Sequence, residues 1–152
     1  GANIYGFHAD AARTFSVGRI SEEADNLIKV TEQSFFEAIK YARELNTIGD
    51  ISFAIQNYVE SHGYSVVKAF TGHGIGKDLH ESPEVPNFGG KSSGIMIRKG
   101  MALAIEPMVN MGSEHINVLD DNWTVITRDG SLSAHYENTV IITSDEPEII
   151  TL

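Results

Sequence analysis

The chain has 152 residues, of which 41% are hydrophobic and 21% are charged, and its formal net charge is −10. These values describe one soluble globular domain with its own core. No apolar run approaches the ~20 residues of a membrane span, and the acidic charge argues against nucleic acid as a partner. The sequence has no cysteine, which excludes disulfides, thiolate metal sites and cysteine nucleophiles. Metal ligands would therefore be carboxylates and imidazoles, a donor set that suits Mn, Fe, Co or Zn.

The first residues follow the pattern of extended chain. Residues 2–7 and 11–17 are predicted to be two extended segments that break around residues 8–10. The chain opens inside the first pattern, without Met and without a polar lead-in, and no secretory signal is visible. We therefore expect further sequence upstream of Gly1.

Two helices are predicted to follow. Ser21 is expected to cap the first, because acidic residues come directly after it and apolar residues recur at helical spacing as far as Leu45. Residues 46–49 are predicted to end this helix. Asp50 is then expected to cap a second helix, with Gly63 just past its end.

The second half of the chain is predicted to be mostly strands. A β-branched run over residues 64–70 predicts one strand, and residues 71–100, rich in Gly, Pro and Ser, predict a long ordered loop. Further strands are predicted near residues 101–106, 115–119, 123–127 and 134–142. Two strands, two helices and then a series of strands make an α+β order, and no linker divides residues 1–152 into two domains.

Five polar residues stand in local settings that are unusual for surface charges: Asp10, His73, His80, Glu106 and Glu137. Glu106 follows an apolar run, and Glu137 lies in a stretch that otherwise has the pattern of a central strand. Ionised groups are rarely buried unless they are paired or bound to metal, and few Lys or Arg residues stand nearby. The acids are therefore expected to share a metal.

Glycines surround one of these histidines, in residues 72–76. The pattern fails as a P-loop, because Thr71 stands at the first glycine position, and as a dinucleotide fingerprint, because Lys77 stands at the third. The glycines either let backbone pack closely around His73 or form a tight turn with an exposed histidine. The remaining histidines are expected to have structural or surface roles: His8, His62, His115 and His135.

Taken together, three carboxylates and one or two imidazoles could hold two metal ions roughly 3.5–4 Å apart. Such a pair lowers the pKa of a bridging water and polarises a carbonyl, which predicts hydrolysis of amides or phosphate esters. No serine stands in a Gly-x-Ser-x-Gly elbow, so no serine nucleophile competes with this interpretation.

Six stretches carry a resemblance to a known family: residues 6–10, 72–81, 83–87, 101–109, 121–125 and 133–139. In this order, and over nearly all 152 residues, they are similar to the type I methionine aminopeptidases, metallopeptidases with the pita-bread (creatinase/aminopeptidase-like) fold. The segments at Glu106 and Trp123 favour this family over the Xaa-Pro peptidases of the same fold. The resemblance implies a curved, mostly antiparallel sheet with two helices on one face, and residues 1–152 as one portion of the catalytic domain.

The resemblance also implies the metal ligands. Asp10 and Glu137 would bridge two divalent ions (Co, Mn, Fe or Zn), and His73 and Glu106 would complete the shell of one of them. These four residues are among the five that local sequence context singles out, and the resemblance gives the fifth, His80, a different role.

Catalytic and substrate-binding roles follow from the same resemblance. Glu106 would handle the proton of the attacking water, His80 would hydrogen-bond the scissile peptide, and Leu79 and Trp123 would line the pocket for the N-terminal Met side chain. The implied activity is removal of N-terminal Met from nascent polypeptides in the cytoplasm, with ribosome association as a further expectation and no membrane partner. The alternatives are an Xaa-Pro peptidase and a non-catalytic peptide- or protein-binding module of this fold.

The chain departs from the family's pattern at three positions. The family usually has Ser or Thr where Ala11 stands, His where Asn138 stands, and often an aromatic residue where Leu79 stands. Family members also carry an N-terminal part that supplies a first Asp ligand, a further catalytic His and much of the Met pocket. Without that part, the 152 residues by themselves are expected to be inactive.

Overall fold

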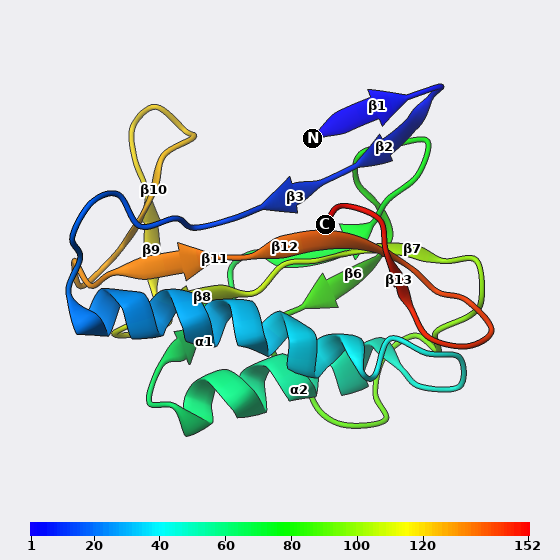
Figure 1. Cartoon of the computed structure of the whole chain (residues 1–152), viewed down its shortest axis with the longest axis horizontal. Helices are drawn as coiled ribbons and strands as arrows, with labels where there is room; N and C mark the ends of the chain where they lie inside the picture. The colour runs from blue at the N-terminus through cyan, green and yellow to red at the C-terminus, as the bar shows by residue number, and fades with distance from the viewer.

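The computed structural model describes residues 1–152 and contains two helices and thirteen short strands (Figure 1). The helices are α1 (Glu22–Ile39) and α2 (Ile48–Ser61). The strands are β1 (Ala2–Ile4), β2 (Phe7–Ala9), β3 (Ala11–Ala12), β4 (Ser65–Val66), β5 (Thr71–Gly74), β6 (Glu81–Pro86), β7 (Ala102–Ile105), β8 (Met108–Asn110), β9 (Ile116–Val118), β10 (Val125–Thr127), β11 (Ser133–His135), β12 (Glu137–Ile141) and β13 (Glu148–Ile149). Neither helix is long and apolar enough to cross a membrane.

The main sheet runs in the order β13-β12-β7-β5-β6, and β3 also pairs with β12. A second sheet has the order β11-β8-β4, and β1-β2 and β9-β10 form separate two-stranded ribbons. All strand pairs are antiparallel. The two helices lie on one side of the sheets, and the β1-β2 ribbon stands on the other (Figure 1). This arrangement confirms the predicted α+β fold with both helices on one face.

An aromatic cluster joins α1 to the strand layer. The rings of Phe35 and Phe36 lie 5.4 and 5.9 Å from the ring of Tyr136, and Phe35 is fully buried. Ile55 of α2 is also fully buried in the same core. Burying one such side chain contributes about 1.5–3 kcal/mol to stability. Because Tyr136 directly precedes Glu137, the core that stabilises the fold also positions the start of β12.

The helix boundaries differ in part from those predicted. Ser21 caps α1 as predicted, through its hydroxyl. The helix ends well before Leu45, which is 83% exposed and has a positive φ of 74° that a right-handed helix cannot contain. Thr47, not Asp50, precedes α2: the Asp50 carboxylate reaches back to the Thr47 N–H at 2.8 Å and closes a capping box. Gly63, with φ +81°, follows the end of α2 as predicted.

The N-terminal segments turn earlier than predicted. Residues 2–7 do not form one extended segment, because Tyr5 and Gly6 adopt positive φ values of 52° and 84° and end β1. The Asn3 side chain accepts a hydrogen bond from Gly6 N at 3.2 Å, which stabilises this turn. β2 then continues through residues 8–9, where the break was predicted.

The prediction of a loop over residues 71–100 was wrong, because this segment contains β5 and β6. A Cβ on Gly72 would lie 2.3 Å from the carbonyl oxygen of Ala104, and one on Gly74 would lie 2.3 Å from that of Ser82. Glycine is required at both positions so that neighbouring backbone can approach. Glycines that resembled loop residues in sequence therefore belong to a closely packed strand.

Candidate metal centre

Four of the predicted site residues meet at the middle of the main sheet. The ligand atoms of Asp10, His73 and Glu137 lie within 4.8 Å of one another. Glu106 joins them: its Oε1 is 3.6 Å from His73 Nε2, and it has an oxygen within 4.8 Å of a Glu137 oxygen. We call these four residues the ligand cluster. The structure thus brings together all four residues that the sequence predicted as metal ligands.

Sheet register explains why distant residues meet. β12 pairs with β3, with Glu137 opposite Ala12, so Glu137 lies beside the chain that carries Asp10. β12 and β5 both pair with β7, and Glu106 directly follows the end of β7. His73 on β5 lies opposite a residue near that same end. The pairs β3-β12, β12-β7 and β7-β5 therefore bring the four residues of the ligand cluster together.

The tautomer of His73 is set by the backbone of its own strand, β5. Its Nδ1 lies 2.8 Å from the carbonyl oxygen of Gly74, which can only accept a hydrogen bond. In the neutral ring, Nδ1 therefore carries the proton and Nε2 keeps its lone pair, directed at the ligand cluster. His73 is 7% exposed, so the ring is held in this orientation. A donated hydrogen bond from the other ring nitrogen is typical of metal-binding histidines.

The main chain of Asp10 is hydrogen-bonded to one hydroxyl on β12. The Asp10 N–H donates to Thr139 Oγ1 at 2.8 Å, and that hydroxyl donates to the Asp10 carbonyl at 2.9 Å. Thr139 stands two residues after Glu137 on β12, so it projects from the same face of the strand. The pair of bonds positions the Asp10 carboxylate beside Glu137.

Burial and neighbouring carboxylates raise the pKa of Glu137. It is 4% exposed, and burial, together with the carboxylates of Glu106 and Asp10, raises the pKa of Glu137 from 4.5 to about 8. Among the side chains, Arg13 is a nearby cation, and it donates to the main-chain oxygen of Glu137 and, at 2.7 Å, to Asn138 Oδ1. It therefore forms no direct pair with the carboxylates. Three carboxylates and one free imidazole nitrogen fit divalent metal ions well.

Metal binding is expected to release about one proton from Glu137 at pH 7. Below a pKa of about 8 the metal-free carboxyl holds its proton, and a metal ligand must give it up. Titration calorimetry in two buffers of different ionisation enthalpy measures the number released. At pH 9 the release should largely disappear, and equal release at the two pH values would contradict the assignment.

The same shift predicts how metal-free stability depends on pH. The folded state binds the Glu137 proton more tightly than the unfolded state, so this contribution is full below pH 4.5 and is lost as pH rises through about 8. Chemical unfolding in the presence of a chelator should show this fall. Glu137→Gln should flatten it.

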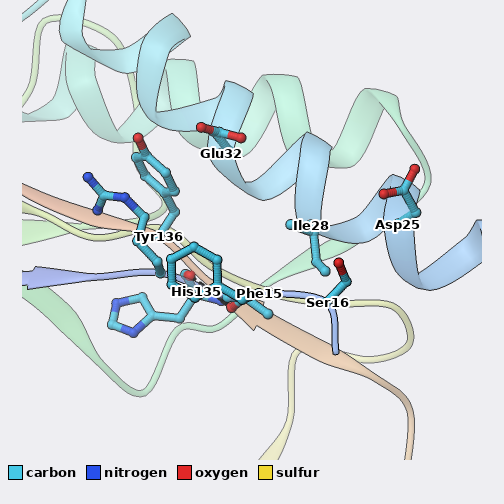
Figure 2. Close-up of a pocket in the computed structure, with 9 residues that line it drawn as sticks. Phe15, Ser16, Asp25, Ile28, Glu32, His135 and Tyr136 are labelled. Carbon is cyan, nitrogen blue, oxygen red and sulfur yellow. Dashed lines mark hydrogen bonds between the residues drawn. The ribbon is translucent and has the colours of Figure 1, made fainter. Parts of the chain in front are cut away.

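His135 belongs to this region, although the sequence was interpreted as giving it a structural or surface role. Its Nε2 lies 3.4 Å from Glu106 Oε2, and the ligand atoms of His135, Glu106 and Glu137 lie within 4.8 Å of one another. Figure 2 shows the Tyr136 ring directed toward α1 and the His135 imidazole on the other side of the strand. Alternation along a strand places His135 and Glu137 on one face. That alternation is the sequence signal that could have identified it.

Two departures from the family's pattern prove to be neighbours. Ala11 and Asn138 are cross-strand partners in the β3-β12 ladder. Asn138 is fully buried and accepts hydrogen bonds at Oδ1 from Arg13 at 2.7 Å and from Thr151 at 3.0 Å. Asn138 thus joins Arg13 and the C-terminal segment behind the ligand cluster.

The three predicted substrate-binding residues lie in different settings. His80 is exposed, and its ring centroid is 4.4 Å from that of His73 in an edge-to-face arrangement. Leu79 beside it is partly buried. Trp123 lies in the connection between β9 and β10 and is 87% exposed. The structure therefore places His80 beside the ligand cluster. The Trp123 side chain is not buried against any other part of the chain.

Comparison with known proteins identifies the family. The sequence pattern of metallopeptidase family M24 matches residues 1–144. The chain is 60% identical over 152 residues to the methionine aminopeptidase of Clostridium perfringens and 46% identical over 151 residues to methionine aminopeptidase 1 of Bacillus subtilis. These matches cover 100% and 99% of the chain but only 61% of each relative.

Solved structures agree with this assignment. A methionine aminopeptidase from Thermotoga maritima superposes with a TM-score of 0.95 at 44% identity, over 97% of this chain and 59% of that one. A prolidase from Pyrococcus furiosus, at 20% identity and a TM-score of 0.75, shares the fold alone, over 97% of this chain and 38% of that one. The predicted resemblance to methionine aminopeptidases and the pita-bread fold are confirmed. The chain belongs to metallopeptidase family M24.

Proposed function

We propose that the protein carrying this chain removes N-terminal Met from polypeptides by metal-dependent hydrolysis. The observation that carries the proposal is the convergence of Asp10, His73, Glu106 and Glu137 into one cluster of metal-ligand type. The activity named for relatives at 46–60% identity supports the choice of substrate. The nascent polypeptides of the cytoplasm would be the natural substrates, and association with ribosomes is part of the same proposal.

The ligand cluster would hold two divalent ions, with Mn, Fe, Co and Zn as the candidates. Asp10 and Glu137 would bridge them, and His73 and Glu106 would complete the shell of one. When bound, such a pair acidifies a water molecule and polarises the scissile carbonyl. The chain's own task is to hold the ligands rigidly, and the hydrogen bonds of His73 and Asp10 serve that purpose.

Glu106 is suited to move the proton. Its side chain is 13% exposed. One carboxylate oxygen of Glu106 lies near the imidazole of His73, and the other lies near the imidazole of His135. A carboxylate placed there can accept a proton from the attacking water and pass it to the departing amine. Substrate would approach from the side where His80 is exposed.

His80 would act on the peptide instead of the metal. The ring of His80 lies beside that of His73. His80 is not one of the residues whose ligand atoms meet in the ligand cluster. From this position an imidazole N–H can donate to the scissile peptide oxygen as negative charge develops on it. Leu79, next to it, would contribute to the apolar wall of the Met pocket, with Trp123 on the β9-β10 connection as a second part of that wall.

A peptide panel tests the proposed specificity. Release of N-terminal Met should exceed release of Leu or Ala, because an apolar pocket shaped for an unbranched side chain loses about 1–3 kcal/mol per missing methylene. The comparison of kcat/KM for peptides that differ only in the first residue measures this. Leu79→Ala and Trp123→Ala should raise KM for Met peptides. A strict requirement for Pro at the second position would indicate an Xaa-Pro peptidase instead, and metal binding without hydrolysis of any peptide would indicate a binding module.

A further inference from the structure

Arg13 contacts three consecutive residues at the start of β12. Its guanidinium carbon lies 4.1 Å from the centroid of the Tyr136 ring, Nη1 donates to the carbonyl oxygen of Glu137, and Nη2 donates to Asn138 Oδ1 at 2.7 Å. We propose that Arg13 is a positioning residue of the metal centre, which fixes the main chain of Glu137 and through it the direction of the Glu137 carboxylate. The inference rests on the proposed metal-dependent function, because it concerns the residue that would bridge the two ions.

The main chain of Glu137 lies where two strand ladders end. The ladder between β12 and β7 begins only at Asn138, so Glu137 is not paired on that side. On the other side β3 has two residues, and the pair of Glu137 with Ala12 is the last of that ladder. Ordering a residue at such an end costs conformational entropy with few hydrogen bonds to offset it. Glu137 therefore gains more from a contact outside the ladders than a residue in the middle of β12 would.

Arg13 supplies such a contact, and it does so across both strands. Its Nη1 donates to the carbonyl oxygen of Ala12 on β3, at 2.8 Å, and to that of Glu137 on β12, so one nitrogen joins the two main chains. A guanidinium is planar, stays charged, and has five N–H donors in a fixed fork. It can therefore stack on the Tyr136 ring while it reaches acceptors on both strands, which a lysine ammonium cannot do.

Arg13 contacts β12 on the face opposite to the ligand cluster. The Tyr136 ring, over which the guanidinium lies, is directed toward α1, whereas alternation along the strand directs Glu137 to the other face (Figure 2). The guanidinium donates to main-chain and amide oxygens and to no carboxylate of the ligand cluster. Arg13 thus holds the backbone of Glu137 and leaves the oxygens of its carboxylate available to metal ions.

Asn138 holds the other arm of the guanidinium. This residue is fully buried, and its Oδ1 accepts from Arg13 and, at 3.0 Å, from the Thr151 hydroxyl. The same hydroxyl accepts from the Thr139 N–H at 3.0 Å, so the acceptor for Arg13 is itself tied to β12. Asn138 Nδ2 is buried without a partner, which is unfavourable. The side chain of Asn138 is therefore oriented so that its oxygen receives Arg13, although its own amide group goes unpaired.

The test replaces Arg13 in the protein that carries this chain, with Co²⁺ as the probe. Arg13→Met keeps most of the length of the side chain but removes its charge and donors, and it should weaken Co²⁺ binding, measured by calorimetry, by about 10–100-fold. Both ions should be affected, because Glu137 is the proposed bridge. Arg13→Lys keeps the charge but not the fork, so most of the loss should remain. Arg19→Met removes an exposed arginine and, as the matched control, should leave the affinity unchanged.

Two further measurements separate positioning from a general effect on the fold. In Arg13→Met, kcat for release of Met should fall while KM stays the same, because the proposed Met pocket is not altered. Asn138→Leu removes the acceptor of Nη2 and should also weaken Co²⁺ binding. If Arg13 and Asn138 act through one contact on Glu137, the loss in the double variant should be smaller than the product of the two single losses.

Three results would overturn the inference. Unchanged Co²⁺ affinity in Arg13→Met would show that Glu137 is held without Arg13. Full recovery of the affinity in Arg13→Lys would show that charge matters and position does not. If circular dichroism shows that metal-free Arg13→Met does not fold, Asn138→Leu decides, and unchanged affinity in that variant would be the third. None of these results touches the proposed function, which would fail separately if the unsubstituted protein bound no Co²⁺ or released no Met.

Discussion

Replacing Glu137 with alanine is expected to abolish binding of both proposed metal ions and to lower kcat/KM by at least about 10³-fold. Glu137 belongs both to the group of ligand atoms with Asp10 and His73 and to the group with Glu106 and His135. Because Glu137 is the proposed bridge, its loss would remove a bond to each ion. The loss of an outer-shell partner of a metal ligand already costs 10–100-fold. Metal content after dialysis and release of Met from a short peptide measure the two effects.

Two companion variants make this result specific. Glu148→Ala removes an exposed carboxylate from β13, the strand next to β12, and should leave metal content and turnover unchanged. Glu137→Gln keeps the shape of the side chain but should bind no more metal than Glu137→Ala. Above pH 8 its metal-free form should be more stable than the unsubstituted protein, because it lacks a buried charge beside Glu106 and Asp10. Retention of one tight ion in Glu137→Ala would show that Glu137 is not a bridge.

Replacing His80 with alanine is expected to lower kcat by about 10²–10³-fold while both ions stay bound. This range is typical for removal of one hydrogen-bond donor to a developing oxyanion. The ring of His80 lies beside His73 but outside the ligand groups, so metal affinity should be unaffected. Steady-state kinetics together with metal titration separate the two quantities.

The matched control for His80 is His115→Ala, because His115 is also exposed but is not part of either ligand group. It should behave as the unsubstituted protein in both assays. If His80→Ala lost metal as readily as Glu137→Ala, His80 would be a ligand, and its role on the peptide would have to be withdrawn.

Local sequence was sufficient for the features that depend on neighbouring residues. Ser21 caps α1 because its hydroxyl meets an N–H three residues away. The acids Glu106 and Glu137 were recognisable because apolar residues flank them, which marks a charge that needs a partner. The residue types of the metal centre, carboxylate and imidazole without thiolate, were likewise determined by the sequence alone.

Glycines and capping residues are compatible with more than one local structure, and in two places tertiary packing determined which one forms. Residues 71–100 have loop composition, yet β5 and β6 form there because Gly72 and Gly74 let neighbouring carbonyls approach to distances that a Cβ would block. Asp50 is a good capping residue, yet it serves as the third residue of a capping box begun by Thr47. Local propensity permitted both outcomes in each case.

The membership of the site was decided only by the tertiary structure. Asp10 meets β12 through Thr139, 129 residues away, because β3 pairs with β12. His135 reaches Glu106 because β11 pairs with β8, and no sequence distance encodes that register. The sequence by itself determined which chemical groups this protein can offer to a metal and which of them are costly to bury alone. The pairing of strands determined which groups share one site, because burial and mutual repulsion act only between residues that the sheet has brought together.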